Sequence, residues 1–299
     1  MSVRQPHARG VALAVASTAL VATNYVTAKV ALGGLNLETF FFLWFAAGTV
    51  LSVGHQIVSK RFGFFPELVR HARALAPMAA LGAVSNLLFF AGVGCLDPAI
   101  SAICYRTELV FSVLLGIVTL KEHLNRMEWA GFALVVAGLA VIYYRGGAAI
   151  GVGALVMVLS AMLGVVSNWL AKRADPDVDV GLMVAVRCMG SLALAAAYAL
   201  VTRRFNADAP PLPLAMVAVG ALLGPFLSFV CYFAALRYMD FSKVAILRNS
   251  EPVFAAVYGL VFLGAFPGGR QLTGCLLALA GVLLVALFRP RPAKAAGGN

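Results

Sequence analysis

The chain alternates long apolar runs with short polar segments. Each run is about as long as the roughly 20 apolar residues that an α-helix needs to cross a hydrocarbon core about 30 Å thick. This pattern predicts an all-α integral membrane protein with ten transmembrane helices. The ten runs are 10–32, 38–58, 74–94, 98–120, 127–144, 150–171, 179–201, 213–236, 241–263 and 270–288.

The pattern repeats within the chain, because segment 233–288 overlies segment 90–145 at an offset of 143 residues. The matched positions are Asp97 with Asp240, Ala102–Ile103 with Ala245–Ile246, Glu108 with Glu251, Phe111 with Phe254, Gly116 with Gly259, Gly131 with Gly274, and Gly138 with Gly281. Five helices per half is an odd number, so the second half enters the membrane from the opposite side. We therefore expect two inverted five-helix repeats, 1–145 and 146–299, an arrangement found in many secondary transporters.

Composition agrees with a membrane protein, since 62% of the residues are hydrophobic, 12% are charged and the mean hydropathy is +0.93. We interpret the formal net charge of +11 as a sign of how the chain is oriented in the membrane, and it does not indicate a nucleic-acid partner. With the N-terminus in the cytoplasm, most cations fall on the inner side, as the positive-inside rule requires. The inner set is Arg4, Arg9, Lys60, Arg61, Arg70, Arg73, Lys121, Arg126, Lys172, Arg173, Arg237, Arg289, Arg291 and Lys294, and the outer set is Arg145, Arg203, Arg204 and Arg270. We expect an inner-membrane protein with both termini cytoplasmic.

Prolines and glycines predict local features of these helices. Asp97–Pro98 is typical of a helix start, with Asp as N-cap and Pro in the first turn. Pro225 and Pro252 fall inside predicted helices, where each removes a backbone hydrogen bond and could form a hinge. The pairs Gly131/Gly138 and Gly274/Gly281 each mark one helix face and favour close helix packing in lipid.

Four charged residues lie deep in the predicted membrane: Arg106, Glu108, Arg248 and Glu251. A charge at the bilayer centre costs about 2.5–3.5 kcal/mol on insertion scales, so each should face a cavity or a partner. Arg248 and Glu251 are spaced i, i+3 and could pair. Arg106 and Glu108 are spaced i, i+2 and should point apart, whereas Tyr105 shares a face with Glu108. The group is either a substrate or coupling-ion site or a buried ion-pair network that locks the helices together.

Further polar residues extend the candidate substrate-binding set. These are Asn24, Tyr25, Asn86, Asn168, Trp169, Arg187 and Asn249. The asparagines could equally join helices by hydrogen bonds. We interpret Trp44 and Trp129 as interfacial anchors and leave them out of the site.

Enzymatic chemistry is not indicated, because no HExxH, GxSxG or P-loop motif occurs and every histidine lies near a helix end. We expect no cofactor and no bound metal. Without a nucleotide-binding loop, transport would be a secondary process or passive facilitation.

Several short motifs together resemble the EamA family of the drug/metabolite transporter superfamily. They are Asn24–Lys29, Leu120–Glu122, Arg187 and Glu251–Ala255. The chain departs from the family pattern at Trp44, Leu109 and Leu263–Ala265. The resemblance implies a cavity between two halves that opens alternately to each side, with amino acids and small metabolites among the substrates.

The favoured hypothesis is therefore a secondary exporter of small polar or zwitterionic metabolites, working by alternating access. One alternative is a lipophilic-cation or drug exporter with Glu108 and Glu251 as its anionic site. Another is a membrane scaffold that transports nothing. The expected partners are a small-molecule substrate and the lipid bilayer, and a homodimer is also compatible with the sequence.

Overall fold

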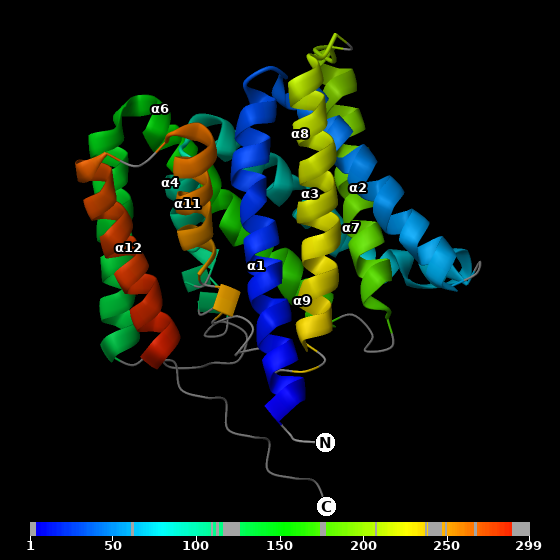
Figure 1. Ribbon diagram of the computed structural model, residues 1–299, viewed down its shortest axis with the longest axis horizontal. Helices are drawn as coiled ribbons and strands as arrows, with labels where there is room; N and C mark the ends of the chain where they lie inside the picture. Colours follow the sequence, from blue (N-terminus) through cyan, green and yellow to red (C-terminus); the bar gives the residue numbers. More distant parts are fainter. Residues whose placement is uncertain are drawn as a thin grey trace, which may run out of the picture.

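The computed structural model describes residues 4–60, 63–108, 110–111, 114–115, 126–173, 178–206, 208–236, 238, 247–248, 250–265 and 268–288. Throughout these ranges the regular secondary structure is helical (Figure 1). The helices are α1 (Arg4–Leu32), α2 (Leu37–Lys60), α3 (Phe64–Cys95), α4 (Pro98–Tyr105), α6 (Arg126–Arg173), α7 (Val180–Thr202), α8 (Pro211–Ala221), the π-helix η1 (Leu222–Ser228), α9 (Phe229–Leu236), α11 (Glu251–Leu263) and α12 (Gly269–Phe288).

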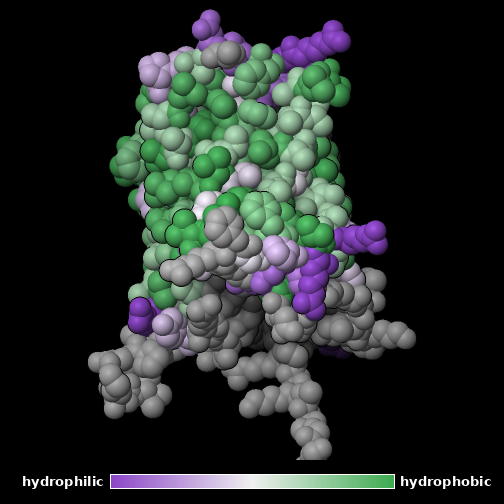
Figure 2. All heavy atoms as spheres, turned by 90° about the vertical axis from the view of Figure 1, so that its right-hand side faces the viewer, coloured by the Kyte–Doolittle hydropathy of each residue, from purple (hydrophilic) through white to green (hydrophobic). Residues whose placement is uncertain are grey.

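Six segments in the described part of the chain are long and apolar enough to cross a membrane, and three shorter apolar helices accompany them. The six are Arg9–Leu32, Leu37–Ser59, Phe64–Cys95, Gly151–Ala171, Gly181–Thr202 and Pro211–Tyr232. Figure 2 shows a broad hydrophobic surface with hydrophilic residues gathered toward its two ends. Exposed apolar side chains of this kind, such as Val58, Leu200 and Phe262 at 70–81% exposure, suit contact with lipid. The chain is a multi-pass membrane protein.

Helix α6 is continuous over 48 residues and includes both of the expected spans, 127–144 and 150–171. A straight helix of that length would measure about 72 Å, far more than a bilayer core. In Figure 1 the ribbon of α6 rises beside α12 and turns over at the top of the view. Its first part packs on α12, where Gly138 meets Ala278, and its second part packs on α3, where Gly153 meets Cys95. The chain thus reverses direction within the segment that forms α6.

The two helices next to the predicted charges, α4 and α11, are short and run antiparallel. Pro98, at the start of α4, lies against Gly259 in the second half of α11. At the other end of the contact, Arg106 follows α4 and meets Glu251, the first residue of α11.

Asp97 precedes α4 as expected, although its side chain makes no capping hydrogen bond. Pro252 falls in the first turn of α11, where no backbone hydrogen bond is lost, so the predicted mid-helix position is wrong. Asp240 and Gly116, the repeat counterparts of Asp97 and Gly259, lie outside the described residues, as does the whole Leu120–Glu122 motif.

Pro225 does lie inside a helix, and the backbone around it is a π-helix between α8 and α9. Insertions of this type are common where proline interrupts the normal hydrogen-bond ladder. The Ser228 hydroxyl donates to the carbonyl of Gly224, and the Ser17 hydroxyl of α1 donates to the carbonyl of Ser228 at 2.9 Å. One serine hydroxyl thereby forms a hydrogen bond within η1, and the other joins η1 to α1.

An aromatic cluster fills the interior between α2 and α3. The Trp44 ring lies 5.1 Å from both the Phe40 and Phe90 rings and is only 1% exposed. Gly220 of α8 leaves the space that the indole occupies. Trp44 is therefore a core residue, and its interpretation as an interfacial anchor is wrong. Trp129, which is 58% exposed, has the exposure expected of an anchor.

The two glycine pairs pack against each other, as the sequence predicts. A Cβ on Gly138 would lie 2.6 Å from the carbonyl oxygen of Gly274, and one on Gly281 would lie 2.5 Å from that of Gly131. Only glycine permits backbones to approach this closely. The contact joins α12 to the first part of α6 at one edge of the molecule (Figure 1).

Candidate functional site

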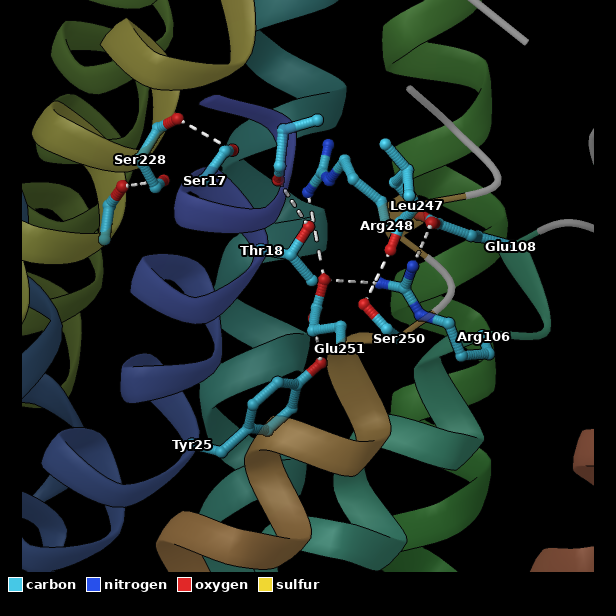
Figure 3. A network of polar contacts seen from close by, with 12 residues as sticks. Ser17, Thr18, Tyr25, Arg106, Glu108, Ser228, Leu247, Arg248, Ser250 and Glu251 are labelled. Carbon is cyan, nitrogen blue, oxygen red and sulfur yellow. Dashed lines mark hydrogen bonds and ion pairs between the residues drawn. The ribbon is translucent and has the colours of Figure 1, made fainter. Parts of the chain in front are cut away.

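A network of charged and phenolic side chains lies where α1, the end of α4 and the start of α11 meet (Figure 3). Arg106 is at its centre. One terminal nitrogen of its guanidinium lies 3.0 Å from a carboxylate oxygen of Glu251, and the other lies 3.1 Å from Glu108. The expectation that Arg106 and Glu108 point apart is wrong, because α4 ends at Tyr105 and residues 106 and 107 form a turn. The i, i+2 geometry of a continuous helix does not apply there.

Helix ends explain why these charges are tolerated. The C-terminal end of a helix carries partial negative charge and the N-terminal end partial positive charge. Arg106 follows the C-terminal end of α4, and Glu251 opens α11. Each side chain therefore meets a favourable dipole as well as an oppositely charged partner.

Glu251 has three partners in the described part of the chain. The Tyr25 hydroxyl of α1 donates to one carboxylate oxygen at 2.9 Å, while Arg106 and Arg248 approach the other at 3.0 and 3.9 Å. The expected Arg248–Glu251 pair is thus formed. The Arg248 guanidinium also lies 4.8 Å above the ring of Tyr232 on α9. Sequence reasoning missed Tyr232, since no spacing rule links it to a residue 16 positions away.

Burial divides the network into an inner and an outer pair. The side chains of Arg106 and Glu251 are each 3% exposed, whereas those of Glu108 and Arg248 are 24% and 25% exposed. Arg106 and Arg248 each keep a buried Nε atom that has no hydrogen-bond acceptor among the described residues. A bound molecule would therefore reach Glu108 and Arg248 first.

Tyr105 connects the network to the rest of the interior. Its ring packs on Phe89 with 5.1 Å between centroids, and the Arg106 guanidinium lies 5.7 Å from the ring centroid. Its hydroxyl lies against Gly164 of α6, where a Cβ would come within 3.1 Å of the oxygen. Tyr105 therefore occupies the space between the charged network and α6.

The remaining candidates are spread over α1, α3, α6 and α7. Arg187 donates to the side-chain oxygen of Asn168 at 3.3 Å, and Asn86 donates to the Ser191 hydroxyl at 3.0 Å. The Asn24 side chain lies against Gly224, and its oxygen is buried with no hydrogen-bond donor among the described residues. Trp169 is partly buried on α6, and Asn249 lies outside the described residues. None of these side chains has a described hydrogen bond or ion pair with the Glu251 network.

With all four groups ionised, the network has no net charge. A neutral group of two cations and two anions, with one of each sign partly exposed, suits a ligand that itself carries both signs. Nothing in the described residues gathers three or more histidine, cysteine or carboxylate side chains into a metal site.

A multi-pass helical bundle with charged side chains in its interior is an architecture that solute transporters use. The sequence model of the EamA-like transporter family matches residues 8–144 and again 148–287. The chain belongs to this family. Its members are transporters, so the protein is not an enzyme.

Three comparisons describe its relatives. A probable terminal-alkyne amino-acid exporter of Streptantibioticus cattleyicolor is 33% identical over 83% of this chain and 86% of its own length. An uncharacterized transporter of Pseudomonas aeruginosa is 24% identical over 72% of each chain. A solved crystal structure with 19% identity superposes with a TM-score of 0.63 over 93% of this chain and 97% of its own, which shows a common fold.

Proposed function

We propose that the protein is a secondary transporter that exports small zwitterionic metabolites, amino acids among them. The observation that carries the proposal is the pair of partly exposed side chains, Glu108 and Arg248, beside the buried Arg106–Glu251 ion pair. An ammonium group would bind the Glu108 carboxylate, and a carboxylate would bind an arginine side chain inside the helix bundle. The name of the Streptantibioticus relative, a probable terminal-alkyne amino-acid exporter, supports this substrate class.

The pairing of every glutamate in the network with an arginine favours a zwitterion over a lipophilic cation. Glu251 already contacts Arg106 and Arg248, and Glu108 contacts Arg106. A site for a lipophilic cation requires an excess of negative charge, and the described network has none. A ligand with both charges replaces the existing ion pairs without leaving a buried charge unpaired.

The mechanism that we propose is alternating access by two inverted five-helix repeats, 1–145 and 146–299, with ten spans in all. Equivalent helices of inverted repeats run in opposite directions. The antiparallel contact of α4, which precedes Glu108, with α11, which begins at the matched Glu251, supports this arrangement. The separate family matches to 8–144 and 148–287 support the same division. An inner-membrane location with cytoplasmic termini belongs to this proposal.

Efflux from proteoliposomes tests the function. The purified protein is reconstituted into vesicles loaded with propargylglycine, an amino acid with a terminal alkyne, and the external probe is measured by azide coupling. Glu108→Gln keeps the size of the side chain but removes its charge. Loss of one hydrogen bond to a charged group should weaken substrate binding about tenfold or more, and efflux should decrease with it.

The matched control is Asp208→Asn, which neutralises an exposed carboxylate in the loop between α7 and α8. We expect Asp208→Asn to transport like the parent and Glu108→Gln to fold normally but to lose most efflux. Equal efflux from the parent and Glu108→Gln would exclude Glu108 as a substrate ligand. Efflux no faster than from protein-free vesicles would exclude amino-acid export.

A further inference from the structure

Arg187 differs from the other arginines inside the helix bundle. It lies seven residues into α7, about 10 Å along the helix axis, within the membrane-spanning segment Gly181–Thr202. Arg106 and Arg248 each form an ion pair with glutamate. Among the described residues, no carboxylate lies within ion-pair distance of Arg187; its partners there are Asn168 and the ring of Phe229. A cation at this depth is costly unless an anion or water compensates it.

The surroundings hold the Arg187 side chain in place. Gly82 of α3 leaves room for it, since a Cβ there would lie 3.5 Å from the Arg187 Nε. Phe229 of α9 packs below the guanidinium, with 5.9 Å to the ring centroid. One terminal nitrogen donates to the Asn168 oxygen at 3.3 Å. A planar guanidinium fixed on several sides is well suited to a carboxylate, which it can bind through two parallel hydrogen bonds.

Asn168 adds to this capacity. Its side-chain oxygen accepts from Arg187, so its amide nitrogen retains two donor hydrogens. Asn168 is exposed and Arg187 is partly buried, so both can be reached by a small molecule. The hydrogen-bond donors of the two side chains thus form a positively charged group, and no carboxylate among the described residues pairs with it.

This pair lies one helical turn from Tyr105. Gly164, against which the Tyr105 hydroxyl lies, and Asn168 are four residues apart on α6 and so share a face. On its other side, the Tyr105 ring lies 5.7 Å from the Arg106 guanidinium, which is 3.1 Å from Glu108. Tyr105 is therefore close to the partly exposed Glu108 through Arg106, and its hydroxyl lies one helical turn from Asn168, the partner of Arg187.

We propose that Arg187 and Asn168 form a subsite for the carboxylate of the transported molecule, separate from the Glu251 network. The ammonium group of the same molecule faces Glu108, and Tyr105 borders the site. This inference rests on the proposed transport function and deepens it, because it makes a free carboxylate a requirement for the substrate. Arg187 then selects amino acids against amines of the same shape.

Two probes that differ only in the carboxylate test the subsite. Propargylglycine carries it, and but-3-yn-1-amine is the same molecule without it. Binding of each probe to the purified protein is measured by isothermal titration, and efflux of each from proteoliposomes by azide coupling. The variants are Arg187→Gln, Asn168→Ala and, as a control, Arg204→Gln, which neutralises an exposed arginine beyond the other end of α7.

We expect the parent and Arg204→Gln to prefer propargylglycine over the amine. Arg187→Gln should weaken binding of propargylglycine by roughly tenfold or more while leaving that of the amine unchanged, which abolishes the preference. Asn168→Ala, which keeps the charge, should reduce the preference by a smaller factor and serves as the deciding variant if Arg187→Gln does not fold.

Other outcomes overturn the proposal. An unchanged preference in Arg187→Gln, or in Asn168→Ala if the first variant does not fold, shows that the carboxylate binds elsewhere. An equal loss for both probes assigns Arg187 to helix packing. If the parent transports propargylglycine but Arg187→Gln fails in one of these ways, the transport function stands and the subsite alone is rejected. If the parent transports neither probe, the function is rejected together with the subsite.

Discussion

Substitution Glu251→Gln should destabilise the folded protein because it removes the charge shared by two arginines. Glu251 is 3% exposed and lies 3.0 Å from Arg106 and 3.9 Å from Arg248. Glutamine can still accept from one neighbour and donate to the Tyr25 oxygen, so its size and part of its hydrogen bonding are kept. The network, however, changes from neutral to a charge of +1. Breaking a buried ion pair costs about 3–5 kcal/mol, and we expect about 3 kcal/mol because the glutamine keeps some contacts.

The substitution Arg248→Gln tests whether the loss of stability arises from the charge of the network. Arg248 is 25% exposed and 3.9 Å from its partner, so Arg248→Gln alone should cost less than about 1 kcal/mol. Combined with Glu251→Gln it restores a neutral network made of Arg106 and Glu108. We therefore expect the double variant to be more stable than Glu251→Gln alone, although it has lost one more side chain. Such non-additivity is the signature of coupled charges.

The assay is the free energy of unfolding, from titration with a denaturing detergent, for the parent and the three variants. The amount of protein inserted in the membrane supplies an independent measure. Equal stability of Glu251→Gln and the parent would contradict this prediction. A double variant that loses the sum of the two single effects would also contradict it, because the charge of the network would then have no influence on folding.

Two further predictions concern packing and topology. Gly281→Ala, whose Cβ would lie 2.5 Å from the Gly131 carbonyl oxygen, should destabilise the α6–α12 contact by about 1–3 kcal/mol. Gly54→Ala, where nothing lies within 4 Å, should be neutral or slightly stabilising, so similar melting temperatures for both would contradict the proposed packing. Reporter fusions at the C-terminus and in the loop at 203–210 should give opposite sides of the membrane, and the same side for both would contradict the ten-span proposal.

Features set by local spacing could be predicted from the sequence. Glycines seven residues apart predict a close helix contact, and the structure has it between Gly138 and Gly274. The i, i+3 spacing of Arg248 and Glu251 predicts their ion pair. Both inferences need only the geometry of one helix and a choice of which face is buried.

Features that depend on where a helix ends could not be predicted in this way. The Arg106–Glu108 contact exists because α4 stops at Tyr105, and no glycine or proline at that point indicates a stop. Trp44 looked like an anchor because position along an apolar run does not tell which face meets lipid, and its place in the core depends on Gly220, far away in sequence. The repeat makes Glu108 and Glu251 equivalent, whereas their exposures of 24% and 3% arise from the helices packed around each.

The π-helix η1 has a consequence for the side chain that meets Arg248. A π-helix holds one residue more than an α-helix over the same span, and each residue of an α-helix turns the chain by about 100°. Deleting a single residue from Leu222–Ser228 would let α8 and α9 join as one regular helix. Every side chain of α9 would then rotate by about a quarter turn, and Tyr232 would leave the guanidinium that it now faces at 4.8 Å. The contact between α9 and the charged network is thus determined by the length of a seven-residue segment as much as by the identity of the residues that touch.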